Sequence, residues 1–161
     1  MEKKKKMKVI VLKGRDNSGK TTTLKKVHEF LMKAGGEQET NYKVDLKGND
    51  DFRDVINFAG KKIGIVTQGD YGKKQIKQGC DVEKMTAFSV GEHLEALDRA
   101  HCDVAICACT TGKNIEKTIT KDYPEATPID KEIKSLQEIE NTLKAMEIIQ
   151  ILNLWLLDAT K

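Results

Sequence analysis

Residues 8–22 read KVIVLKGRDNSGKTT, and this stretch decides the fold. Four apolar, mostly β-branched residues lie between two lysines at its start, which is typical of a short buried strand. A glycine-rich loop follows at residues 14–19, and apolar residues then recur at helical spacing until an Ala-Gly-Gly stop signal at residues 34–36. The stretch therefore predicts a strand, a tight loop and a helix in immediate succession.

The loop has the spacing of a phosphate-binding motif: a glycine, four further residues and then Gly-Lys-Thr. Its backbone N–H groups are expected to form an anion nest at the positive end of the helix dipole. We expect Lys20 to reach the β- and γ-phosphates, Thr21 to offer its hydroxyl to Mg²⁺ and Thr22 to contact the α-phosphate. The candidate binding residues are Gly14, Asp16, Asn17, Ser18, Gly19, Lys20, Thr21 and Thr22.

This arrangement resembles the P-loop nucleoside triphosphatase superfamily, and the resemblance rests on residues 8–31. It implies a three-layer α/β/α sandwich that binds a nucleoside triphosphate with Mg²⁺. The rest of the chain alternates strand and helix patterns, which also favours a sheet with helices on both faces. Residues 52–59 and 61–67 predict two strands joined by a Gly60-Lys61 turn, so we expect a mostly parallel sheet with an antiparallel edge hairpin.

Two further helices and one strand are predicted between residues 73 and 110. A short helix is expected near residues 73–78. Ser89 and Glu92 have the spacing of a capping box, so a helix is expected over residues 89–101 with His101 on its apolar face. The apolar run CDVAICACT, residues 102–110, predicts another buried strand. A short helix is expected around residues 115–120.

The C-terminal segment, residues 128–158, is expected to be helical. Residues 127–130 read TPID, a threonine cap followed by proline and an acid, which predicts a helix start. Apolar residues then recur every three or four positions, at Ile133, Leu136, Ile139, Leu143, Met146 and Ile149. Residues 148–157 are apolar except for Gln150 and Asn153, so this stretch either packs on several sides within the chain or forms a subunit interface.

Composition bounds the class of protein. The chain has 161 residues and a net charge of +3, which predicts one domain spanning residues 1–161 with a flexible basic tail at residues 1–7. No aromatic residues are interleaved with the lysines of this tail, so no nucleic-acid partner is expected. The four cysteines form no C-x-x-C pair, and no apolar stretch is long enough to cross a bilayer. We therefore expect a cytoplasmic protein with reduced thiols and no membrane partner.

An acidic residue that holds the metal is expected beyond an apolar strand. Asp70 follows the strand at residues 61–67, whereas residues 103–111, DVAICACTT, end without a carboxylate. Asp70 should stand near the phosphates if its strand lies beside residues 8–13 in parallel. With Thr21 it is our candidate metal ligand, and Lys20, Asp70 and Arg15 are the candidate catalytic residues.

The end of the strand at residues 102–110 is a second candidate contact region. Thr110, Thr111 and Lys113 are expected to lie near the nucleotide base or a second substrate. The guanine-binding Asn-Lys-x-Asp pattern is absent, since residues 111–114 are Thr-Gly-Lys-Asn, and ATP is therefore the expected nucleotide.

Two branches of the superfamily share details of the loop. Thymidylate kinases resemble it most closely, and that resemblance implies that Asp16 faces a substrate sugar or hydroxyl. Their later Asp-Arg-aromatic motif has no counterpart here, because the Asp98-Arg99 pair lies within a predicted helix. ParA-like dimeric ATPases place a lysine directly after the first glycine, and Arg15 occupies that position.

Two functions follow from these patterns. The first is an enzyme that binds ATP and Mg²⁺ and either hydrolyses ATP or transfers its γ-phosphoryl group to a small molecule. The second is a nucleotide-regulated assembly module, a switch in which residues 148–157 pair two chains as a homodimer. None of His28, His93 and His101 is expected to be catalytic.

Overall fold

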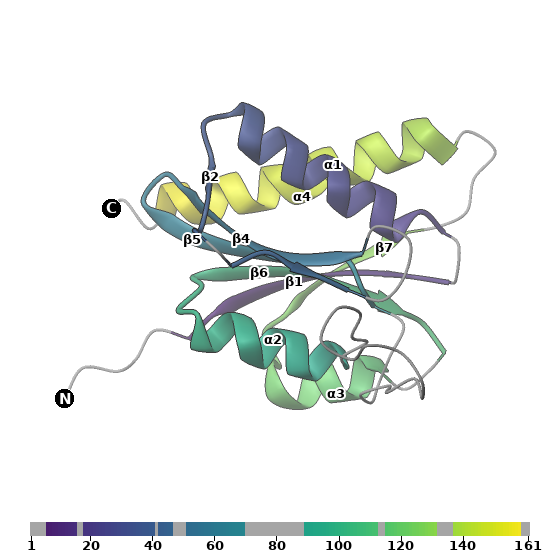
Figure 1. The fold of residues 1–161 in the computed structure, drawn as a ribbon. Coiled ribbons are helices and arrows are strands. Elements are labelled where there is room, and N and C mark those ends of the chain that lie inside the picture. The colour runs from purple at the N-terminus through teal and green to yellow at the C-terminus, as the bar shows by residue number, and fades with distance from the viewer. Residues whose placement is uncertain are drawn as a thin grey trace, which may run out of the picture.

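The computed structural model describes residues 6–15, 18–40, 42–46, 51–69, 89–112, 115–131 and 137–158. Within these ranges the chain forms one seven-stranded mixed sheet with helices on both faces (Figure 1). The strands are β1 (Lys8–Gly14), β2 (Glu37–Gln38), β3 (Val44–Asp45), β4 (Phe52–Phe58), β5 (Lys61–Val66), β6 (Val104–Thr110) and β7 (Thr127–Lys131). The helices are α1 (Lys20–Lys33), α2 (Val90–Arg99), α3 (Ile115–Asp122) and α4 (Gln137–Asp158).

The order of the strands places β1 between two parallel neighbours, β6 and the terminal strand β7. The sheet runs β2-β4-β5-β6-β1-β7, and β3 also pairs with β4. The neighbours β5–β6, β6–β1 and β1–β7 are parallel, whereas β4 runs antiparallel to β5, β2 and β3. Strand β4 therefore begins at the edge where the parallel strands end.

The predicted hairpin is confirmed, with its turn one residue earlier than expected. The two turn residues are Ala59 and Gly60, whose φ angles are 52° and 77°. Positive φ at both central positions is the requirement of a type I′ turn, which matches the twist of an antiparallel pair. The expected antiparallel arrangement of β4 and β5 thus has a local cause.

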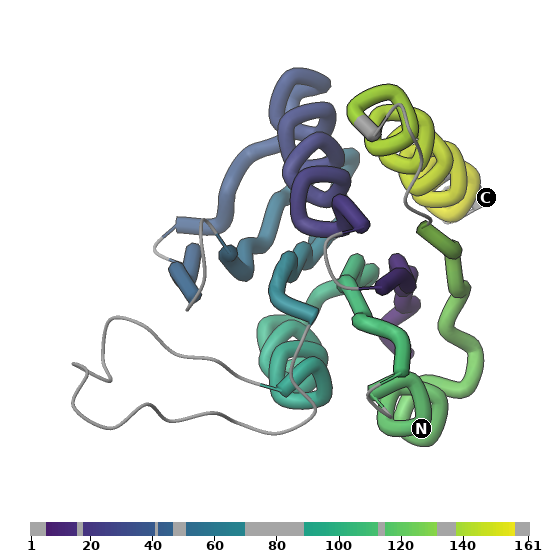
Figure 2. The backbone as a smooth tube through the Cα atoms, turned by 90° about the vertical axis from the view of Figure 1, so that its right-hand side faces the viewer, coloured from purple at the N-terminus to yellow at the C-terminus, as the bar shows by residue number. Residues whose placement is uncertain are grey.

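Two apolar cores lie on opposite faces of the sheet. Helices α1 and α4 cover one face, and α2 and α3 cover the other (Figure 2). Strand β1 contributes Ile10 and Leu12 to the first core and Val9 and Val11 to the second. Burial on both faces explains why this strand is a continuous apolar run, as the sequence predicted.

The strongest local helix signal is confirmed at α2. Glu92 N donates to Ser89 Oγ at 3.1 Å, and Ser89 N donates to a Glu92 carboxylate oxygen at 3.2 Å, which completes the capping box. His101 is exposed and has a φ of 65° beyond the helix end, so its predicted place on the apolar face is wrong. The helix predicted near residues 73–78 lies outside the described residues.

The predicted helix start at residues 127–130 is wrong. Residues 127–131 form β7, which pairs in parallel with β1 at the end of the sheet, and residues 128–131 of the expected helical segment are therefore a strand. Pro128 lacks the N–H that a central strand would need, and an edge strand tolerates that loss. The described helix begins at Gln137.

Helix α4 does not bury all of the apolar residues that recur along it. Ile139, Leu143 and Met146 are about half exposed, whereas Ile148 and Leu152 are buried in the core beside α1. The apolar stretch at residues 148–157 therefore packs in part within its own chain. In the part of the chain that the structure describes, no helix is long and apolar enough to cross a membrane.

Candidate functional site

The glycine loop joins the end of β1 to the start of α1. Gly14 ends β1, and Gly19 has a φ of 89° directly before the helix, a conformation that side chains disfavour. A Cβ at Gly14 would come within 2.5 Å of Ser18 Oγ and 2.6 Å of the Lys131 carbonyl oxygen. A side chain would therefore be strained at Gly19 and would clash with neighbouring atoms at Gly14. Asp16 and Asn17 lie outside the described residues.

The ammonium group of Lys20 lies against the loop. Its Nζ donates to the carbonyl oxygens of Gly14 at 3.0 Å and Arg15 at 2.7 Å. The residue is only 7% exposed, so its charge is largely shielded from solvent. A buried ammonium close to the first helical turn of α1 is an environment that favours anions.

A second lysine, which the sequence did not predict, reaches the same loop. Lys131 lies at the end of β7, opposite Gly14 in the strand register, and is 3% exposed. Its Nζ donates to the carbonyl oxygen of Ser18 at 2.7 Å. Because residues 128–131 were expected to be helical, the sequence did not place this side chain beside the loop.

A cavity of about 410 Å³ opens beside the loop. Its lining includes three basic side chains, Lys13, Arg15 and Lys131, and one carboxylate, Asp130. The pKa of Lys13 is raised by its hydrogen bond to Glu116, 2.9 Å away, which outweighs the opposing effect of burial. A cavity with this excess of positive charge suits a phosphorylated ligand.

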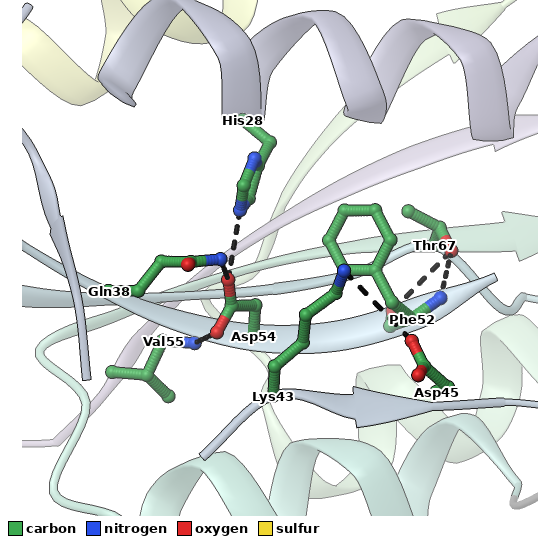
Figure 3. A network of polar contacts seen from close by, with 8 residues as sticks. All are labelled: His28, Gln38, Lys43, Asp45, Phe52, Asp54, Val55 and Thr67. Atoms are coloured by element: carbon green, nitrogen blue, oxygen red, sulfur yellow. Dashed lines mark hydrogen bonds and ion pairs between the residues drawn. The ribbon is translucent and has the colours of Figure 1, made fainter. Parts of the chain in front are cut away.

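Thr21, in the first turn of α1, faces a carboxylate. Its Oγ1 lies 3.4 Å from Asp51 Oδ1, and Thr67 Oγ1 donates to the same oxygen at 2.8 Å. Thr67 is fixed in turn by Phe52, whose N donates to Thr67 Oγ1 at 2.9 Å and whose carbonyl accepts from Thr67 N at 3.0 Å (Figure 3). Asp51 was missed because the sequence around it predicts only a turn.

Asp70 was expected near the phosphates on condition that its strand pairs with β1, and that condition is not met. Strand β6 lies between β5 and β1, so the strand before Asp70 does not flank the loop strand. Asp70 itself lies outside the described residues, as does Lys113. The end of β6 does meet the loop, because Thr111 N donates to the Gly14 carbonyl at 3.0 Å and Thr110 is buried beside it.

This edge of the sheet is also a topological switch point. From β1 the chain passes through α1 on one face toward β4 and β5. From β6 it passes through α3 on the other face toward β7 (Figure 1). Ligands of open α/β sheets bind in the crevice that such diverging connections leave at the carboxyl ends of the strands.

Arg53, His93 and Gln68 form a chain of hydrogen bonds near the end of β5. His93 Nδ1 accepts from Arg53 at 3.0 Å, and His93 Nε2 contacts Gln68 Oε1 at 2.8 Å. Because a guanidinium can only donate, the proton of the neutral ring is on Nε2. Burial, reinforced by the charge of Arg53, lowers the pKa of His93 to about 3. The imidazole is therefore neutral at ordinary pH and orients Gln68.

A second buried network ties α1 to the sheet. Asp54 is fully buried and accepts from Gln38 Nε2 at 2.6 Å and from Val55 N at 2.9 Å, while His28 Nε2 lies 2.9 Å from it (Figure 3). The helix that begins at the loop is thus linked to the strand that begins after Asp51.

The cysteines offer no reactive thiolate in the described residues. Cys102, Cys107 and Cys109 are free and buried, and Cys80 lies outside the described residues. Burial raises the pKa of Cys102 to about 12 and that of Cys109 to about 11. Within the described ranges, no group of three or more His, Cys, Asp or Glu residues could hold a metal ion.

Comparisons of the chain with models of protein families, with curated proteins and with solved structures found no match.

Proposed function

We propose that the chain is a P-loop protein that binds ATP with Mg²⁺ and either hydrolyses ATP or transfers its γ-phosphoryl group to a small molecule. One observation carries the proposal: the ammonium of Lys20, the first residue of α1, donates to the carbonyl oxygens of Gly14 and Arg15 at the end of β1. The seven-stranded mixed sheet with helices on both faces is compatible with the three-layer sandwich of that superfamily.

The residues at the loop fit a polyphosphate. Because Gly14 has no side chain, backbone atoms can line the site there. Lys20 and Lys131 bring two buried ammonium groups to it. Loop N–H groups would bind phosphate oxygens, and Lys20 would offset the negative charge that develops on the leaving group. The basic cavity beside Arg15 and Asp130 would hold the nucleoside or a second substrate.

The residues also fit a magnesium ion. Mg²⁺ in such sites takes one or two protein oxygens and completes its shell with phosphates and water. Thr21 lies in the first turn of α1, and its hydroxyl faces the Asp51 carboxylate. The two groups offer the protein oxygens that such a magnesium site uses. When bound, Mg²⁺ supplies charge neutralisation at the β- and γ-phosphates. Asp16 and Asn17 keep the roles that the superfamily resemblance implies for them.

A panel of ligands tests the nucleotide proposal directly. Thermal unfolding is measured with ATP, GTP, ADP and tripolyphosphate, each with and without Mg²⁺. We expect ATP with Mg²⁺ to raise the melting temperature and Lys20→Ala to remove most of that rise. Lys33→Ala, at the exposed far end of α1, is the matched control. A wild-type chain that no triphosphate stabilises would refute the proposal.

A specific observation favours the switch as a second candidate. Among the described residues, the large hydrophobic side chains that are exposed all lie on α4, at Ile139, Leu143, Met146 and Leu154. Helix α4 packs against α1, which begins at the loop. Light scattering with and without ATP and Mg²⁺ tests this candidate, since a switch requires a nucleotide-dependent change of mass that Leu143→Glu abolishes.

A further inference from the structure

Two oxygen atoms from distant parts of the chain meet beside the loop. Thr21 Oγ1 and Asp51 Oδ1 are 3.4 Å apart, although the two residues are 30 positions apart in the sequence. Two oxygens that bind one Mg²⁺ at right angles, at about 2.1 Å each, are separated by about 3 Å. The pair therefore needs to close by only a few tenths of an ångström to share one cation.

The antiparallel course of β4 explains how the carboxylate arrives there. Asp51 directly precedes β4, and β4 begins at the edge where β1, β5 and β6 end. An acidic residue at the start of β4 therefore lies at the same edge of the sheet as an acidic residue at the end of a parallel strand. Sequence patterns that look only beyond apolar strands cannot find it.

Thr67 holds the carboxylate in position. It donates to Asp51 Oδ1, the same oxygen that faces Thr21, and its own place is set by the paired backbone of Phe52. Asp54, which lies within β4, has other partners. It is buried beneath α1 and contacts His28, Gln38 and Val55 N. The contacts therefore single out Asp51 as the carboxylate directed at Thr21.

We propose that Asp51 and Thr21 together bind the metal ion that accompanies the nucleotide, with Thr67 as the positioning residue of Asp51. The inference rests on the proposed nucleotide function and replaces Asp70 as the protein carboxylate of that site. An aspartate and a threonine hydroxyl are hard oxygen ligands, which Mg²⁺ and Mn²⁺ prefer.

Manganese provides a readout that is independent of turnover. Free Mn²⁺ is counted by electron paramagnetic resonance during titration of the protein in the presence of ADP, and metal-free ADP affinity is measured separately by calorimetry in EDTA. We expect Asp51→Asn to weaken Mn²⁺ binding at least about tenfold. Metal-free ADP affinity should stay equal or increase, because a negative charge near the phosphates is lost.

Matched variants separate the two carboxylates. Asp45→Asn, an exposed aspartate on the neighbouring strand β3, should bind Mn²⁺ like the wild type, and so should Asp70→Asn. Thr67→Val should weaken Mn²⁺ binding less than Asp51→Asn does, and Thr67→Ser, which keeps the hydroxyl, should restore it. Thermal unfolding of each variant checks that the fold is retained, with Asp51→Glu as the substitute if Asp51→Asn does not fold.

The outcomes distinguish this inference from the function on which it rests. Wild-type Mn²⁺ affinity in Asp51→Asn, with a loss in Asp70→Asn, would overturn the assignment to Asp51 and leave nucleotide binding intact. A wild-type chain that binds no ADP in EDTA or with metal would overturn both. Loss of Mn²⁺ binding in Asp51→Asn with ADP binding preserved supports both.

Discussion

The ammonium of Lys131 donates a hydrogen bond to the carbonyl oxygen of Ser18 at 2.7 Å, across 113 residues of sequence. It joins the final described strand of the sheet to the glycine loop that follows the first. Lys20 binds two carbonyl oxygens at the start of the same loop. A lysine thus binds the described backbone on each side of the loop, Lys20 at Gly14 and Arg15 and Lys131 at Ser18.

Lys131→Met tests the contribution of the second lysine. The substitution keeps an apolar chain of similar length and removes the charged donor, so the Ser18 carbonyl loses a bond of about 1.5–3 kcal/mol. We expect the dissociation constant for tripolyphosphate, measured by calorimetry without metal, to rise at least about tenfold. Lys117→Met, on the exposed face of α3, is the control, and equal affinities in the two variants would contradict the prediction.

Gly14→Ala tests the closure of the loop. The added Cβ would meet Ser18 Oγ at 2.5 Å and the Lys131 backbone at 2.6 Å, and backbone cannot move aside cheaply. We expect urea unfolding to show a loss of about 1–3 kcal/mol, the usual cost of overpacking. Gly91→Ala, within α2, is the matched control, because the nearest atom to its Cβ would be Thr118 Cγ2 at 3.6 Å, an ordinary contact, and alanine there should be neutral or stabilising.

Two leucines on α4 test which face of the helix is buried. Leu152 is 1% exposed in the core beside α1, and Leu143 is 55% exposed. Leu152→Ala should lower the free energy of unfolding by about 2–5 kcal/mol, the range for large-to-small changes in a core. Leu143→Ala should change it by less than about 0.5 kcal/mol. Similar losses in chemical denaturation would show that the helix is rotated from the position described.

The buried imidazole of His93 predicts a dependence of stability on pH. Its pKa is lowered to about 3 in the folded chain, whereas the unfolded chain keeps a value near 6.5. Between these values only the unfolded state takes up the proton, so the free energy of unfolding falls as pH falls from about 6.5 toward 3. Above pH 6.5 the imidazole contributes no pH dependence.

The slope assigned to His93 is about 1.4 kcal/mol per pH unit within that window. His93→Gln removes the titrating group, and denaturant unfolding at several pH values should then show a slope smaller by that amount. His101→Gln, at the exposed position beyond α2, should leave the wild-type slope unchanged. An identical slope in His93→Gln and wild type would mean that the imidazole titrates normally.

The elements that the sequence predicted correctly have local causes. Strand β1 has a continuous apolar run, the helix α2 has a capping box at Ser89, and the hairpin has a glycine at its turn. The glycine loop also lies between strand and helix as predicted. Each of these features is decided within about ten residues, so no knowledge of the rest of the chain is needed.

The features that were missed depend on distant partners. The TPID stretch has the residues of a helix cap, but pairing with β1 makes it a strand. On α4 nearly all residues are apolar over two turns, so periodicity cannot select the face that α1 will cover. Lys131 and Asp51 meet the loop only because of the strand order and the direction of β4.

The position of β1 in the sheet also sets the order in which the site can form during synthesis. Both strands that pair with β1, namely β6 and β7, are made after residue 103. A nascent chain that ends at α2 carries the glycine loop and the hairpin, yet it lacks the strands that flank β1 and the lysine that closes the loop. The glycine loop is therefore synthesised well before the strands and the lysine that contact it in the folded chain.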